Sequence, residues 1–194
     1  MRGFLIGLGV LLVLALGVGM WVKGVYNGLV TADEGVKTGW AQVENQLQRR
    51  FDLIPNLVRT VQGYAAHERE TLQAVTDARA RVGQARSVDE KIEANQELGS
   101  AISRLLLVVE RYPDLKANVN FIRLQEELSG TENRISVERR RYNDLVQAYN
   151  IKVRSFPTSL FASMLGFERA KPFEADEGSD VAPKVEFPGT GTDG

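Results

Sequence analysis

The feature that most constrains this chain is an unbroken apolar segment at its amino end. Residues 3–22 carry no charged side chain, and a basic residue stands at each end of the run. At a rise of about 1.5 Å per residue, such a helix spans about 30 Å, the hydrocarbon thickness of a bilayer. Trp21 and Tyr26 lie where interfacial aromatic side chains are typical. The sequence therefore predicts a single transmembrane anchor over residues 1–25.

A cleaved signal peptide is the alternative for this segment. Its apolar core spans about 7–15 residues and is followed by a small-residue cleavage site. Residues 15–17 match such a site weakly, but the apolar run continues to Val22, which favours an uncleaved anchor in the cell membrane. The membrane side of the remaining chain stays open, because Arg2 before the run and Lys23 and Lys37 after it nearly balance.

The middle of the chain is predicted to be helical. Glycine and proline are sparse there, and apolar residues recur every three or four positions, the spacing of helices that pack nearly antiparallel. Polar Arg50 and Thr131 occupy two of the missing slots. The predicted fold is all-α: the transmembrane helix and then an up-down antiparallel bundle of three to four long helices over residues 26–170. The three apolar runs are Trp40, Val43, Leu47, Ile54, Leu57, Val61 and Tyr64; Leu98, Ile102, Leu105 and Val109; and Phe121, Leu124, Leu128, Ile135, Tyr142, Leu145, Tyr149 and Phe156.

Capping residues and prolines predict the helix boundaries. Thr31 with Glu34, and Ser87 with Glu90, match the capping box that opens a helix. A proline ends each of the second and third helices, because the residue before proline avoids the α region. The predicted helices span about residues 31–82, 88–111 and 116–155.

Pro55 leaves the first of these helices with two alternatives. A mid-helix proline removes one backbone hydrogen bond and clashes with the preceding turn. If the chain reverses there, four helices form the bundle, and if it only kinks, one long rod leaves the membrane. We expect Arg50, Asp52, Pro55 and Asn56 to form a structural kink, with Arg50 donating to a freed carbonyl or pairing with a buried acid such as Glu138.

Two surface features are candidate contacts for a partner or for lipid. An apolar stretch after the last long helix either caps the bundle or touches lipid, and a basic triplet either forms a solvated face or binds headgroups. The candidates in the stretch are Leu160, Phe161, Met164 and Leu165. The triplet is Arg139, Arg140 and Arg141.

The carboxyl end is predicted to be a disordered acidic tail over residues 171–194. From Pro172 onward, three prolines and four glycines accompany six acids and one lysine, a composition that is typical of disorder. Residues 172–194 carry a net charge of −5 and the whole chain −1, so residues 1–171 carry +4.

Composition excludes several chemistries. The chain has no cysteine and one histidine, His67, which rules out disulfides, thiolate metal sites and a two-histidine metal site within one chain. A net charge of −1 argues against nucleic-acid binding. No nucleotide-binding loop, nucleophile elbow or calcium loop is present. We therefore expect no catalytic residue, no cofactor or metal, no small-molecule substrate, and a surface role for His67.

Four strings resemble the LemA family: RRFDLIPNL at 49–57, GYAAHE at 63–68, YPDLKAN at 112–118 and YN at 142–143. Within the first string, Phe51 stands where many relatives carry a small residue. The resemblance implies an amino-terminal membrane helix and an all-helical antiparallel bundle. It also implies a bundle on the cytoplasmic side, and it offers no established activity and no catalytic residues.

We interpret the chain as a single-pass membrane protein without catalytic activity, whose self-associating helical bundle serves as a scaffold for protein partners. The alternative is a lipid-headgroup-binding or membrane-remodelling protein, which would use the basic body and residues 160–167 on anionic lipid. An enzyme of unknown type is the third hypothesis.

Overall fold

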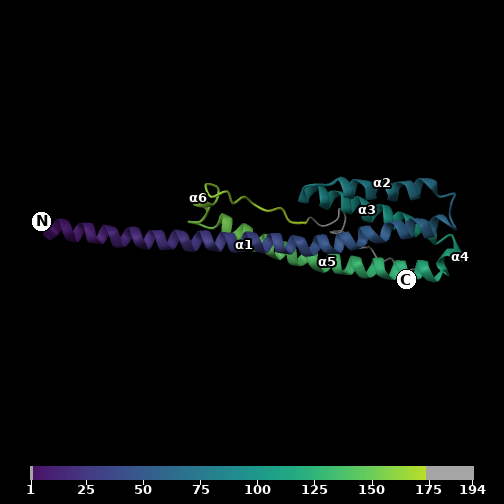
Figure 1. The fold of residues 1–194 in the computed structure, drawn as a ribbon, viewed down its shortest axis with the longest axis horizontal. Helices are drawn as coiled ribbons and strands as arrows, with labels where there is room; N and C mark the ends of the chain where they lie inside the picture. The colour runs from purple at the N-terminus through teal and green to yellow at the C-terminus, as the bar shows by residue number, and fades with distance from the viewer. Residues whose placement is uncertain (1, 174–194) are drawn as a thin grey trace, which may run out of the picture.

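The computed structural model describes residues 2–173, and within that range the chain forms helices joined by turns and irregular segments, without a strand, which confirms the predicted all-α fold. Figure 1 shows a long rod, α1, with α5 beside it and the α2–α3 hairpin over the half farthest from the amino end. The bounds are α1 Arg2–Gln62, α2 Arg69–Gln84, α3 Val88–Val109, α4 Pro113–Lys116, α5 Val119–Arg154 and α6 Ser159–Ala162.

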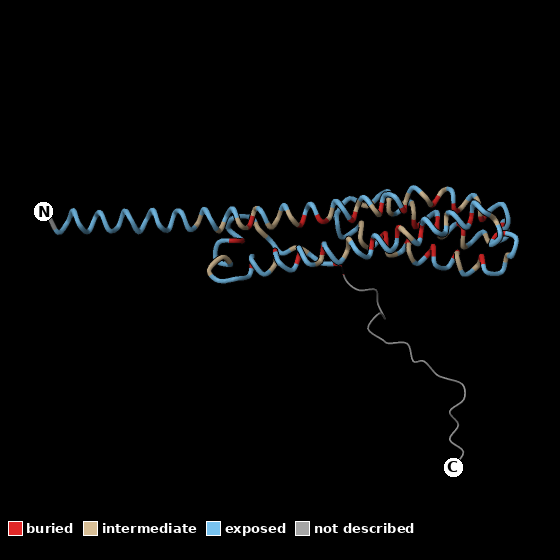
Figure 2. The backbone as a smooth tube through the Cα atoms, turned by 90° about the horizontal axis from the view of Figure 1, so that it is seen from below, coloured by how far each residue is buried: buried red, intermediate tan, exposed pale blue. Residues whose placement is uncertain are grey.

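The predicted membrane anchor is the first part of α1. Among the described helices, α1 is long and apolar enough to cross a membrane, and its apolar window is fully exposed. Figure 2 shows this part of α1 projecting alone, without buried residues, before the bundle begins. The anchor and the first bundle helix are therefore one continuous helix.

The predicted helix start at Thr31 is wrong, because the helix reaches that residue from the anchor. A capping hydroxyl needs an orphan amide, whereas amides inside a helix are already paired. The Thr31 hydroxyl instead donates to the carbonyl of Asn27, at 2.9 Å. The second predicted box is confirmed: the Ser87 Oγ accepts from the Glu90 amide, and the Glu90 carboxylate accepts from the Ser87 amide, both at 3.2 Å.

The chain reverses at residues 63–68 and not at Pro55, so the helix predicted over 31–82 is two helices. The proline leaves the carbonyl of Phe51, four residues earlier, without its helical donor. Arg79 of α2 supplies a replacement, with its Nε donating to that carbonyl at 3.4 Å. The Arg79 guanidinium also lies 4.0 Å above the Phe51 ring. A tertiary contact therefore supports α1 where proline interrupts its hydrogen bonding.

The helices α1, α2, α3 and α5 run in alternating directions and form a four-helix up-down bundle (Figure 1). Neither alternative for Pro55 is right in full, because α1 passes the proline as one long rod and the fourth helix arises from the reversal at residues 63–68. The three apolar runs point inward as predicted, apart from a few positions. Tyr64 is one exception, because α1 ends at Gln62 and the residue leaves the seam. On α5, Val146 is buried, whereas Leu145 is 38% exposed.

We expect Ser87→Ala to lower the free energy of unfolding by about 1 kcal/mol, since it removes one half of a formed capping box. Thr31→Ala serves as the matched control and is expected to cost nothing, because alanine is the better residue inside a helix. Thermal unfolding of the full chain in detergent, followed by circular dichroism, measures both. Equal losses in the two variants would contradict this assignment of helix ends.

Candidate functional site

A layer of buried polar residues crosses the bundle at mid-height. In the described chain, the buried polar side chains are Arg50, Asn95 and Thr131, one from each of α1, α3 and α5. They lie between two apolar clusters. On α1 one cluster ends at Leu47 and the other begins at Ile54. The layer therefore separates two cores, and we call it the polar layer.

The Arg50 guanidinium ties three helices together. One Nη donates to the Glu132 carboxylate of α5 at 2.8 Å. The other donates to Asn95 of α3, at 2.9 Å to its carbonyl and 3.2 Å to its side-chain oxygen. Burial lowers the pKa of Arg50, and the charge of Glu132 acts in the opposite direction. Because arginine titrates far above neutral pH, the side chain stays charged and acts as a fixed cation.

The residues expected to form a kink at Pro55 make separate contacts. Arg50 pairs with Glu132 and not with Glu138, which accepts from Arg141 at 2.9 Å. Asp52 lies on the surface and accepts from Gln48 at 2.8 Å. Asn56, also on the surface, accepts from Arg59 at 2.6 Å. Of the four residues predicted to form the kink, only Arg50 belongs to the polar layer.

A second polar construction holds residues 168–173 against α5, and we call this segment the strap. The side chain of Asn150 pairs with both backbone groups of Ala170, donating at 2.8 Å and accepting at 3.0 Å. Asn143 does the same to Phe173, at 3.0 and 2.8 Å. The side-chain amide of each asparagine thus pairs with one residue of the strap through the same N–H and C=O groups that a neighbouring β-strand would use.

Two tyrosines complete this ladder. Tyr149 donates to the carbonyl of Glu168 at 2.7 Å, and Tyr142 donates to that of Lys171 at 3.0 Å. Burial raises the pKa of both phenols, so their hydroxyls stay protonated as donors at neutral pH. Seven helical residues rise about 10.5 Å and three extended residues about 10 Å, so the repeated Tyr-Asn pair on α5 matches the spacing of the strap.

The aromatic end of the strap is part of the core. Phe173 is buried, stacks on Trp40 with ring centroids 5.8 Å apart, and lies under the guanidinium of Arg139 at 4.6 Å. Lys171 pairs with Asp89 at the start of α3, at 2.6 Å. The prediction that a disordered tail begins at residue 171 is therefore wrong for residues 171–173, because these contacts hold them. The rest of the predicted tail, 174–194, lies outside the described residues.

At the end of the bundle farthest from the anchor, which we call the tip, two of the four strings that resemble the LemA family meet. Glu68, in the turn after α1, accepts from Tyr112 at 2.9 Å and from Arg111 at 3.0 Å, at the end of α3. Asn118 caps α5 with its side-chain oxygen and donates to the hydroxyl of Tyr64 at 2.9 Å. The strings GYAAHE and YPDLKAN therefore meet and close the tip.

The described residues offer little for catalysis. No group of three or more His, Asp or Glu side chains in residues 2–173 is arranged to hold a metal. His67 is exposed in the turn at the tip, as expected for a surface residue. A hollow of about 510 Å³ beside the strap is lined by Asn143, Asn150 and Arg154 among others, without an acid. A second hollow of about 360 Å³, between α1 and α5, contains Glu127 as its one acid.

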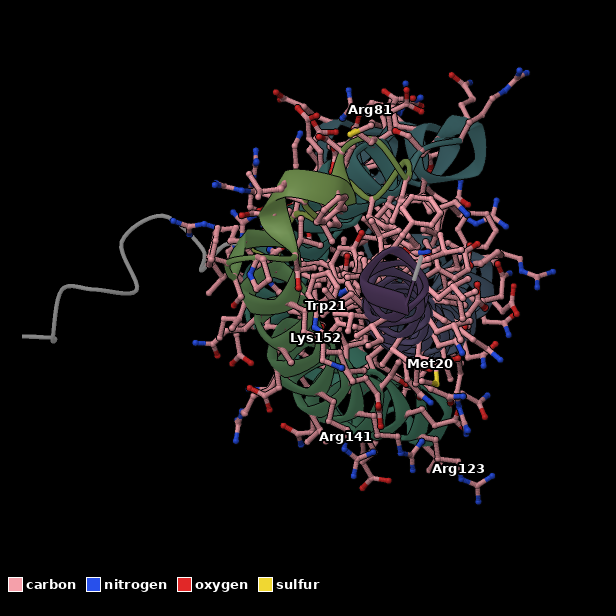
Figure 3. The ribbon with its side chains drawn as sticks, turned by 90° about the vertical axis from the view of Figure 1, so that its left-hand side faces the viewer. Met20, Trp21, Arg81, Arg123, Arg141 and Lys152 are labelled. Atoms are coloured by element: carbon pink, nitrogen blue, oxygen red, sulfur yellow. The ribbon has the colours of Figure 1, made fainter. Side chains whose placement is uncertain are left out.

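The basic triplet lies far from the anchor. Arg139 covers Phe173, Arg141 pairs with Glu138, and Arg140 is exposed. The neighbouring Tyr142 contacts Trp40, which is nineteen helical residues, or about 28 Å, beyond Trp21. Figure 3, viewed from the anchor end, shows Arg141 pointing outward from the periphery of the bundle. The triplet stays a candidate partner contact at this height.

The predicted apolar candidates lie at the opposite, membrane-proximal end. Leu160 and Phe161 belong to α6, and Met164 and Leu165 follow it. All four are exposed, whereas Ala162 between them is buried. Figure 3 shows Trp21 on the side of α1 that faces α6, and its ring lies 6.1 Å from that of Phe161. The segment therefore lies beside the end of the anchor.

Reasoning from sequence missed Asn95 and Glu132 in the polar layer and the whole strap. One signal was available for Asn95: it stands three residues before Leu98, at the next position of the second apolar run. The strap had no comparable signal, because its backbone groups and not its side chains make most of the contacts.

Comparison with known proteins gives consistent matches. The model of the LemA family matches residues 39–187. Magnetosome protein MamQ 2 of Paramagnetospirillum magneticum is 26% identical over 80% of this chain and 67% of its own length. Magnetosome protein MamQ of Magnetospirillum gryphiswaldense is 24% identical over 82% and 70%. Protein LemA of Metamycoplasma hominis is 26% identical over 79% and 71%.

Removing the carboxylate of the polar layer should leave the buried guanidinium of Arg50 short of a partner. We expect Glu132→Ala to lower the free energy of unfolding by about 1–3 kcal/mol. Arg134→Ala, an exposed change on the same helix, should alter it by less than about 0.5 kcal/mol. Denaturant unfolding in detergent measures both. A cycle with Arg50→Met tests the coupling, and additive losses would show that the two residues act independently.

The ladder predicts local protection of the strap. We expect Asn150→Ala to cost about 2 kcal/mol of local stability, and so to speed backbone hydrogen exchange in residues 168–173 about thirtyfold. Gln147→Ala, an exposed change one turn earlier, should leave the exchange unaltered. Mass spectrometry of deuterated peptides gives the rates. Unchanged exchange in the Asn150 variant would mean that the asparagine does not hold the strap.

Proposed function

The chain belongs to the LemA family, and from that premise we propose that it is a membrane-anchored, non-catalytic scaffold. In this proposal the bundle binds protein partners and other copies of the chain while α1 holds it to the membrane. The domains we propose are the anchor over residues 1–25, the bundle with its strap over 26–173 and the acidic tail over 174–194.

The observation that carries this proposal is the continuity of α1. The helix runs without interruption from the anchor to Gln62 at the far tip. From Lys23 onward, its forty residues rise about 60 Å. A hinge between anchor and bundle would let the bundle swing, whereas a continuous helix holds the tip at a defined distance from the membrane. Holding surfaces at a fixed height is what a scaffold requires.

The use of the distinctive strings supports a role without catalysis. The string RRFDLIPNL contributes Arg50 to the polar layer and Phe51 to the contact with α2. The strings GYAAHE and YPDLKAN close the tip, and Tyr142-Asn143 holds the strap. Each string is engaged in holding helices together. A catalytic site instead needs a positioned nucleophile, acid or base beside a pocket.

The anchor supports self-association. Gly17, Gly24 and Gly28 lie within about 40° of one another around α1, since each residue turns the helix by about 100°. In the described chain, apart from neighbouring residues and the nearby backbone of α1, no atom lies within 4 Å of the position that a Cβ would take on Gly17 or Gly24. Small residues that line one face let membrane helices approach closely. Copies of the anchor can therefore pack through this face.

We expect the full chain to form oligomers in lipid bilayers. Because the chain has no cysteine, Asn133→Cys gives one labelling site on the exposed face of α5. Counting photobleaching steps in sparse bilayers should give two or more steps per spot. The variant Gly17→Leu should shift the count toward one, because the larger side chain blocks close approach.

Val18→Leu is the matched control, because it enlarges a side chain that is already branched, about 100° around the helix from Gly17. A strictly monomeric wild-type chain would contradict self-association. The same cysteine reports the side of the membrane, which we propose to be cytoplasmic. In intact cells it should resist a maleimide that cannot cross the membrane, and react after permeabilisation.

A further inference from the structure

The segment after α5 has the composition of a membrane-active turn. Residues 155–167 carry no charge, and Arg154 and Glu168-Arg169 bracket them. An apolar stretch of about 10–14 residues is typically a buried core element or an interfacial segment. The structure argues against the first, because Phe156 and Met164 are 81% and 83% exposed. We call residues 156–165 the foot.

Contacts with α1 give the depth of the foot. Lys152, near the end of α5, reaches the carbonyl of Gly28 at 3.5 Å. After α5 the chain runs toward the anchor until Phe161 contacts Trp21. Trp21 lies seven residues closer than Gly28 to the amino end of α1, which is a distance of about 10 Å along the helix. The chain then turns back toward the bundle, since the Phe167 ring lies 5.9 Å from the ring of Tyr26, five residues beyond Trp21 on α1. The foot is therefore a dip toward the anchor, and it reaches the level where the apolar run ends.

Charge is distributed around the foot as lipid headgroups require. Lys23, Lys152, Arg154 and Arg169 are exposed at this end of the molecule, against one acid of the bracket, Glu168. Basic side chains next to an apolar insertion are attracted to anionic headgroups, each by about 1 kcal/mol near the surface. The apolar side chains of the foot match the acyl region at a membrane surface, and the basic side chains around them match its anionic headgroups.

We propose that the foot inserts into the interfacial region of the bilayer beside the anchor. Its occupant is lipid, and the exposed side chains of Phe156, Leu160, Met164 and Leu165 enter the headgroup–acyl boundary. This inference rests on the membrane anchor of the proposed function. It adds a second attachment point on the α5 side of α1, which fixes both the tilt of the rod and its rotation about its own axis.

Single cysteines in the full chain test the depth of the foot. Met164→Cys carries an environment-sensitive fluorophore, and Leu107→Cys, 72% exposed on α3 in the bundle, is the matched control. Leu12→Cys reports on the anchor. The chain is placed in vesicles of phosphatidylcholine and phosphatidylglycerol. Quenching is measured with a shallow spin-labelled lipid for the foot, with a deep spin-labelled lipid for Leu12 near the middle of the apolar run, and separately with aqueous iodide.

We expect lipid quenching and a blue-shifted emission at Met164 and Leu12, and iodide quenching at Leu107. Phe156→Cys should repeat the Met164 result, which guards against a local effect of one label. Iodide quenching at both foot positions, with lipid quenching at Leu12, would overturn the foot and leave the anchor intact. Protection from both quenchers would mean that protein covers the foot, which also overturns it. Loss of lipid quenching at Leu12 would overturn the anchor and the foot together.

Discussion

The length of α1 dictates how the rest of the chain must fold. A helix of 61 residues is about 90 Å long, whereas the 36 residues of α5 reach about 54 Å. No single partner therefore covers it. The apolar run at the amino end is left for a membrane, α5 covers the following stretch, and the α2–α3 hairpin thickens the far half (Figure 1). Near the anchor, the foot and the strap fill the place that the hairpin does not reach.

The polar layer bears on the register of the long helices. Two parallel rows of aliphatic side chains can slide past one another by one turn at little cost, because one apolar contact resembles the next. A buried guanidinium has one position in which its partners on α3 and α5 all come within reach. Misregistered packing would bury it without them, at the cost of an unsatisfied charge. The contacts of Arg50 therefore favour the observed register of the helices over packing shifted by one turn.

The sequence predicted the features that depend on residues close together in the chain. The apolar spacing identified most of the buried face of each long helix, and the Ser87 box was found because its atoms are three residues apart. The reversal at residues 63–68 was not predicted, because Pro55 was the one position in the first helix considered for a break. The carbonyl that Pro55 leaves without its helical donor is contacted by Arg79, 28 residues away in the sequence, and local patterns do not contain such a contact. The partner of Arg50 was missed for the same reason: register between α1 and α5 depends on turn lengths that periodicity does not contain. Phe51, a minor departure from the family pattern, proved to be the surface on which Arg79 lies.

The direction of the strap has a consequence for what lies downstream. The strap runs antiparallel to α5 and so carries the chain back from the anchor end to Phe173 beside Trp40. That exit point stands about 28 Å above Trp21, next to the start of α3. A protein fused after Phe173 would therefore begin on the side of the rod, away from the lipid headgroups in the proposed arrangement. With α1 anchored in the membrane as proposed, the two ends of the described fold lie at different heights, one in lipid and the other on the flank of the rod beside Trp40.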